Sequence, residues 1–303
     1  MSKGLKYTGE LEWWKMNEIP PDLLARMEKD IKSFKPRAPF QETYCVFEFS
    51  ISGRKKNTIK LKATVENPEI FGEEIEKHYY LLDETIIRRI KDILFAFNLA
   101  YPGLFHIHRG IILRNKEYAG SIDYPNRYSC CIYEKCNWLV LDYLSLEQCW
   151  NWILAKTRFL SFVSREAIDR ALFALSYENS SNEDSFVFYV LLGIESIYND
   201  SSNLGDSIRQ QIIRKVEALL GKLPPKANKA LKVMYEKRSK LFHGSANILK
   251  GWESEDYDEN ELGEILDEQS FIVTATGVLI ATIQKLIKAD ATKIVEHISV
   301  SLE

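Results

Sequence analysis

The sequence predicts an α+β N-terminal domain followed by an all-α helical bundle. Short runs rich in β-branched and aromatic residues occur in the first half, whereas apolar residues recur at helical spacing throughout the second half. The change falls near residue 145. We therefore expect an α+β domain over residues 1–145 and an all-α domain over residues 146–303, without an internal repeat.

Strands and one helix are expected in the N-terminal part. A helix is predicted over residues 79–101, where apolar residues have helical spacing and the chain then meets Pro102-Gly103. The basic stretch GRKKNTIKLK is typical of a solubilising hairpin edge, and its domain, by position alone, suggests a sensor or recognition role. The expected strands are TYCVFEFSI, TIKLKATV, LFHIHRGIILR and NWLVLDYLSL, over residues 43–51, 58–65, 104–114 and 137–146.

The C-terminal part is predicted to be helical throughout. Ser145 and Ser164 stand where N-caps are expected, and Gly221 and Gly244 stand where helices should end. The expected helices cover residues 145–163, 164–177, 182–200, 205–221, 224–244 and 262–287.

Composition indicates a folded protein without a membrane span. The chain has 303 residues, of which 46% are hydrophobic and 27% are charged. No apolar run approaches the roughly 20 residues that a span requires, and the N-terminus lacks the apolar centre of a secretory signal. We expect a cytoplasmic protein that has no membrane partner.

Five cysteines, an odd number without paired CxxC spacing, are expected to be reduced thiols. A zinc site can be drawn from Cys131, Cys136, His106 and His108. Their spacing is irregular, and strand residues fit these positions as well, so we expect no metal and no cofactor.

Charge is strongly segregated along the chain. The net charge of −3 argues against a protein that coats nucleic acid indiscriminately, yet residues 209–240 hold ten basic and two acidic residues, a local charge of +8. Residues 251–268 then hold nine acidic residues and no lysine or arginine. Such a block is usually a solvated face. The other hypothesis is that it folds over the basic segment as an internal competitor for RNA.

Two charged residues interrupt apolar helix faces. Arg238 occupies the position between Met234 and Leu241 on the apolar face of its predicted helix, and Glu195 interrupts the apolar stretch FVFYVLLGIESIY. Burial of a lone charge costs several kcal/mol. We therefore expect Glu195 and Arg238 to face each other across the bundle. His243, just before Gly244, should lie in the last turn, where the helix carbonyls favour a protonated imidazole.

The C-terminal half, from about residue 164 to residue 289, resembles the HEPN domains, and among them the ApeA-like branch. The resemblance is carried by LLGIESIY, by a following basic helix and by MYEKRSKLFHG. Arg238 and His243, four residues apart, match the HEPN signature. Tyr235, Ser239, Gly244 and the upstream Glu195 make the match more specific.

This resemblance implies metal-independent RNA cleavage by a homodimer, with attack of a 2′-hydroxyl on the adjacent phosphate to leave a cyclic phosphate and a free 5′-hydroxyl. It implies that His243 is the general acid or base and that Arg238 stabilises the phosphate, roles that suit an imidazole and a guanidinium. A defence or toxin setting, with an antitoxin or an activating trigger as partner, is implied too. Auxiliary roles would fall to Glu195, Ser239 and Tyr235, and RNA binding to Lys237, Lys240, Lys232 and Arg214.

Two alternatives stand beside the nuclease. The Glu195–Arg238 pair is also what a purely structural bridge would look like, and some HEPN domains are non-catalytic modules for dimerisation or for binding a nucleotide or RNA. The tryptophans are expected to be core or interface anchors rather than base-stacking platforms. They are Trp13, Trp14, Trp138, Trp150 and Trp152.

Overall fold

In the computed structural model the chain forms two compact units. Unit 1 comprises Met1–Cys130 and Asp142–Ala155, and unit 2 comprises Cys131–Leu141 and Lys156–Glu303. Some of the helices and strands are described by their backbone alone. The structure describes residues 6–13, 21–34, 46–52, 58–64, 75–104, 107–114, 117–124, 128–129, 132, 141–160, 166–177, 183–199, 207–242 and 259–294.

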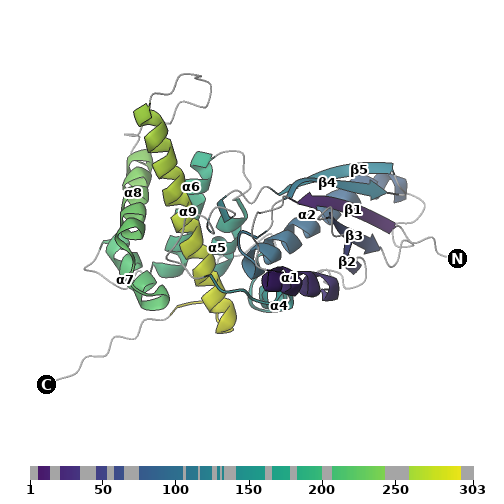
Figure 1. Cartoon of the computed structure of the whole chain (residues 1–303), viewed down its shortest axis with the longest axis horizontal. Coiled ribbons are helices and arrows are strands. Elements are labelled where there is room, and N and C mark those ends of the chain that lie inside the picture. Colours follow the sequence, from purple (N-terminus) through teal and green to yellow (C-terminus); the bar gives the residue numbers. More distant parts are fainter. Residues whose placement is uncertain are drawn as a thin grey trace. The chain divides into compact units, whose positions relative to one another are not determined.

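Unit 1 contains a five-stranded antiparallel ladder in the order β2-β3-β1-β4-β5 (Figure 1). The register pairs Gly9 of β1 with Leu61 of β3 and with Ile112 of β4, so β1 is the central strand. The strands are β1 (Lys6–Trp13), β2 (Val46–Ser52), β3 (Thr58–Thr64), β4 (Ile107–Arg114) and β5 (Glu117–Tyr124). The sequence did not predict β1 or β5.

The described side-chain core of unit 1 is built by α1 (Pro21–Ser33), α2 (Ile75–Ala100) and α4 (Leu146–Lys156). Phe34, which directly follows α1, contacts the other two helices: its ring centroid lies 6.2 Å from that of Phe97 and 6.1 Å from that of Trp150. The Tyr101 hydroxyl donates a 2.5 Å hydrogen bond to Asp30 Oδ2, which also accepts from the Leu146 backbone N–H at the start of α4. Trp150 and Trp152 are buried, as predicted.

The predicted fold class needs a correction. Of the residues that the structure describes with their side chains, 80% are helical, in eight helices, and none lies in a strand. These residues therefore do not show the predicted α+β N-terminal domain, because their buried side chains come from helices and from the segments that flank them. The predicted strand over 137–146 is also wrong over its described part, because 141–145 are irregular and Leu146 begins α4. Asp142–Ala155, which includes most of α4, groups with unit 1, whereas Cys131–Leu141 groups with unit 2. The domain boundary at residue 145 stays a prediction.

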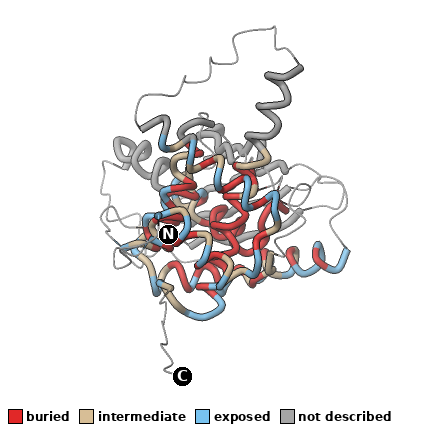
Figure 2. The backbone as a smooth tube through the Cα atoms, turned by 90° about the vertical axis from the view of Figure 1, so that its left-hand side faces the viewer, coloured by how far each residue is buried: buried red, intermediate tan, exposed pale blue. Residues whose placement is uncertain are grey.

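Unit 2 is a helical bundle around α9 (Glu259–Lys288), as Figure 1 shows. Contacts with α9 are made by α5 (Ala167–Ser176), α6 (Glu183–Tyr198), α7 (Ile208–Leu220) and α8 (Pro225–Phe242). Figure 2 shows buried positions recurring along the helices between exposed ones. Ser270–Lys288 is long and apolar enough to cross a membrane, but 83% of its most apolar window is buried in protein, and core helices of soluble proteins have the same length and composition.

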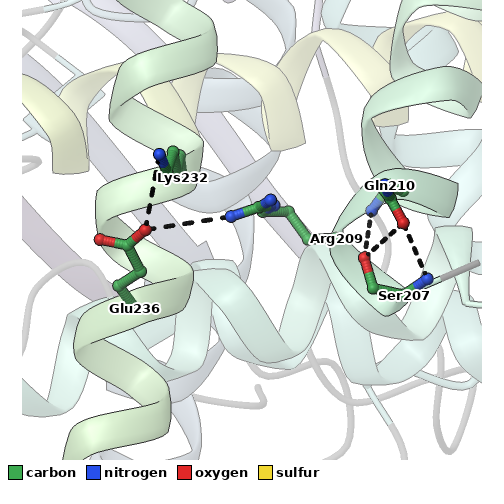
Figure 3. Close-up of polar contacts among 5 residues, drawn as sticks. All are labelled: Ser207, Arg209, Gln210, Lys232 and Glu236. Carbon is green, nitrogen blue, oxygen red and sulfur yellow. Dashed lines mark hydrogen bonds and ion pairs between the residues drawn. The ribbon is translucent and has the colours of Figure 1, made fainter.

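Helix ends follow the sequence in part. Ser145 caps α4 by accepting from the Gln148 N–H at 3.1 Å, and α7 ends at Gly221, whose φ is 91°. The N-cap of α7 is Ser207, which forms a reciprocal capping box with Gln210 (Figure 3). The predicted Ser164 cap lies outside the described residues, and α5 starts after Glu166, whose side chain makes no capping hydrogen bond.

Candidate functional site

Arg238 lies on the buried face of α8. Ala227, Leu231 and Met234 are buried on this helix. Arg238 follows Leu231 by seven residues and Met234 by four, so all three side chains leave the helix within about 60° of one another. The arginine therefore continues the row of core residues, as its spacing predicts.

Glu195 meets Arg238 from α6. Arg238 Nη2 donates to Glu195 Oε2 at 3.1 Å, with 33% of the arginine side chain and 11% of the glutamate side chain exposed. The predicted contact between these two residues is confirmed. The pair is asymmetric, because the carboxylate lies inside the bundle while the guanidinium reaches its surface.

Close packing of α6 fixes the position of Glu195. A Cβ atom on Gly193 would lie 2.8 Å from Leu279 Cδ2 of α9 and 3.1 Å from Ala174 Cβ of α5. The Ser196 hydroxyl donates to the Ala167 carbonyl at 3.0 Å. The backbone that carries Glu195 is therefore held by the packing of Gly193 against α5 and α9 and by the hydrogen bond from Ser196 to α5.

Two polar atoms at this site have no hydrogen-bond partner among the described residues. They are Glu195 Oε1 and the Tyr235 hydroxyl, both of which are buried. Burial raises the pKa of Glu195, and the Arg238 charge lowers it in part. Burial also raises the pKa of Tyr235, to which the Glu195 charge adds. The phenol therefore stays protonated.

The structure describes the other predicted site residues on α8 only in part. Ser239 is exposed, about 100° around α8 from Arg238. His243 lies outside the described residues, as do the side chains of Lys237 and Lys240. The described part of the site is thus Glu195, Arg238 and Tyr235.

The basic segment divides between the interior and the surface. Lys215 is buried, and its Nζ donates to the Tyr198 carbonyl at the end of α6 at 3.0 Å. Glu236 Oε1 of α8 is approached at 3.9 Å both by Arg209 of α7 and by Lys232 of α8 itself (Figure 3). Arg214 is exposed on α7. The local charge of +8 over residues 209–240 includes Lys215, although Lys215 lies three residues after Ile212 and next to Val216, both of which are buried.

Metal ligands are not found in the part of the chain that the structure describes. No group of three or more His, Cys, Asp or Glu side chains there could hold an ion. The alternative zinc ligands Cys131, Cys136 and His106 lie outside the described residues, as does the side chain of His108. Cys149 is a free, buried thiol whose pKa is raised by burial.

Comparison of the chain with protein-family models, curated proteins and solved structures gives no match.

Proposed function

We propose that the protein is a metal-independent endoribonuclease of the HEPN type, acting as a homodimer in a defence or toxin setting. The observation that carries the proposal is Arg238, fixed by Glu195 at 3.1 Å with a third of its side chain still exposed. A guanidinium is always charged and presents a planar set of donors. Held at the rim of a bundle, it suits the binding of phosphate oxygens.

In this proposal, Arg238 stabilises the charge that builds on the phosphate during attack by the 2′-hydroxyl. Glu195 positions the guanidinium. The 2′-oxygen forms a bond to phosphorus as the bond to the 5′-oxygen breaks, giving a cyclic phosphate and a 5′-hydroxyl. His243 is assigned the proton transfer by the resemblance alone, since it lies outside the described residues.

A second candidate function is a non-catalytic HEPN module that dimerises and binds RNA or a nucleotide. One observation favours it: Glu195 offsets the Arg238 charge that a phosphate would otherwise meet. An internal ion pair of this kind also holds two helices together without any ligand. Both functions predict binding to RNA, and they differ in whether the RNA is cut.

The test is incubation of end-labelled RNA with the purified protein, with and without a metal chelator. We expect cleavage that is indifferent to chelation and lost in both Arg238→Ala and His243→Ala. Arg158→Ala, an exposed arginine in unit 2, is the matched control and should cleave like the wild type. RNA that stays intact with the wild type but is bound by it would establish the second function instead.

Product chemistry adds an independent check. Attack by the 2′-hydroxyl leaves a cyclic phosphate, so 3′ ends should resist a phosphatase until acid opens the ring. Arg238→Lys keeps the charge but loses the planar fork, so it should cleave more slowly than wild type. Sedimentation of the full chain measures the proposed dimer, which a monomer at all concentrations would contradict.

A further inference from the structure

Three lysines form a row of unpaired charge on unit 2. Lys222 precedes α8, and Lys226 and Lys229 lie on its first turns; all three are exposed and make no ion pair with any described residue. Lys232 extends the row but approaches Glu236 at 3.9 Å. Lys222, Lys226 and Lys229 are termed the outer lysines below.

The outer lysines on α8 face away from Arg238. Lys229 and Arg238 are nine residues apart, which on a helix of 3.6 residues per turn places their side chains about 180° apart. Lys226 is about 120° from Arg238 by the same geometry. One phosphate group therefore cannot contact both Arg238 and either of the two outer lysines on α8, Lys226 and Lys229, because the body of α8 lies between them.

The surroundings of the outer lysines favour a polyanion as the occupant. The exposed large hydrophobic residues among the described ones are Leu24, Phe173, Leu192 and Ile208, and none of them lies on α8. Helices that lie on a membrane surface need an apolar face to insert. The apolar face of α8 is instead packed in the core of the bundle. Lys226 and Lys229, three residues apart on α8, are offset by about 4.5 Å along the helix axis, so they present separate charges to a chain of phosphates.

We propose that the outer lysines form an exosite for the ribose–phosphate backbone of RNA, distinct from the Arg238 site. The proposal rests on the proposed function for the identity of the polyanion. An RNA that fills both sites has to pass around α8, so it must be longer than a dinucleotide, which has a single phosphodiester. The exosite thus selects for RNA length rather than for base sequence.

The experiment measures RNA binding in an Arg238→Ala background, so that the RNA stays intact. The probe is a single-stranded RNA of about 20 nucleotides, longer than the ~4 to 16 nucleotides that one OB fold covers. The test variant is Lys222→Gln, Lys226→Gln and Lys229→Gln together. Its matched control is Lys29→Gln, Lys32→Gln and Lys91→Gln, three exposed lysines of unit 1 with the same change in charge.

Loss of three phosphate contacts should reduce the slope of log K against log salt by about 2, since each contact with a single strand contributes roughly 0.7. The control variant should keep the wild-type slope. Equal slopes for the two variants would overturn the exosite. Binding of wild type to anionic phospholipid vesicles that is as tight as binding to RNA, and is lost in the same variant, would overturn its assignment to RNA.

This outcome is separable from the failure of the proposed function. If the wild type binds RNA through the outer lysines but never cleaves it, the exosite stands and the nuclease does not. If cleavage depends on Arg238 while the two lysine variants bind alike, the nuclease stands and the exosite does not.

Discussion

Replacing Arg238 with methionine should destabilise the protein more than replacing Glu195 with glutamine, because the two partners differ in burial. The Glu195 side chain is 11% exposed and the Arg238 side chain 33% exposed. An arginine left without its partner can regain water from the surface. A carboxylate left without its partner stays inside the bundle, where burial already raises its pKa.

The expected magnitudes lie between those of surface and core ion pairs. Exposed pairs contribute about 0–1 kcal/mol, whereas removal of one partner of a buried pair costs about 3–5 kcal/mol. We expect roughly 2 kcal/mol for Arg238→Met, roughly 1 kcal/mol for Glu195→Gln and a coupling energy of about 1 kcal/mol in the double-mutant cycle. Urea unfolding followed by far-ultraviolet circular dichroism measures all four proteins.

The cost of Arg238→Met should also depend on pH. Loss of the arginine removes the attraction that lowers the pKa of Glu195. At a pH above 4.5, the ordinary pKa of a glutamate, the folded variant therefore keeps a proton on Glu195 that the unfolded chain releases. Its stability therefore falls as pH rises above the ordinary pKa of Glu195. The deficit relative to wild type should be small near pH 4, where both states are protonated, and should grow toward neutral pH.

Two results would refute this reasoning. One is a loss of unfolding free energy in Arg238→Met that is the same near pH 4 and near pH 7. Such a result would mean that the buried Glu195 carboxylate does not cause the loss. The other is a coupling energy below about 0.3 kcal/mol, which would place the pair among surface contacts of no energetic consequence.

Three further substitutions test the packing described here. Tyr235→Phe removes a buried hydroxyl that has no described partner, so urea unfolding should show stability unchanged or raised by up to about 1 kcal/mol. Gly193→Ala should cost roughly 1–3 kcal/mol in thermal unfolding, because the new methyl group would lie 2.8 Å from Leu279 Cδ2. Asp30→Ala should cost roughly 1–3 kcal/mol in urea, because the buried Tyr101 hydroxyl loses its acceptor at 2.5 Å.

Each of these has an outcome that contradicts it. A loss of stability in Tyr235→Phe means that the hydroxyl has a partner outside the described residues. Gly193→Ala that unfolds at the wild-type temperature means that α6 and α9 can separate at little cost. For Asp30, the matched control is Asp22→Ala on the exposed side of α1; equal losses in the two would exclude the hydrogen bond as the cause.

Local patterns in the sequence predicted what depends on neighbours along the chain. The helical spacing of unit 2 placed five helices near their observed bounds, and two misplaced charges predicted the contact between Glu195 and Arg238. Glu195 is the one carboxylate in an apolar stretch, and Arg238 is the one charge on an apolar helix face. Because burial of an unpaired charge is costly, the two were expected to pair.

The rest depended on packing between distant segments. Helix α4 continues the helical period of the second half, yet it packs on Phe34, which lies far away in sequence. The local charge of +8 over residues 209–240 counts all of the basic residues as if they lay on one surface. Lys215 is buried, however, and Lys229 faces away from Arg238. Counting charge along a sequence gives no azimuth, and the azimuth decides which residues can share a phosphate.

The central position of α9 bears on how unit 2 folds during synthesis. Helices α5 to α8 all contact α9, which is the last of the described helices in the chain order. Until the ribosome has released α9, the apolar faces of the earlier helices lack their common partner and stay open to chaperones. Unit 2 should therefore reach its native state only after nearly all of its residues have been translated, and a premature stop ahead of Ser270 should yield an aggregation-prone product.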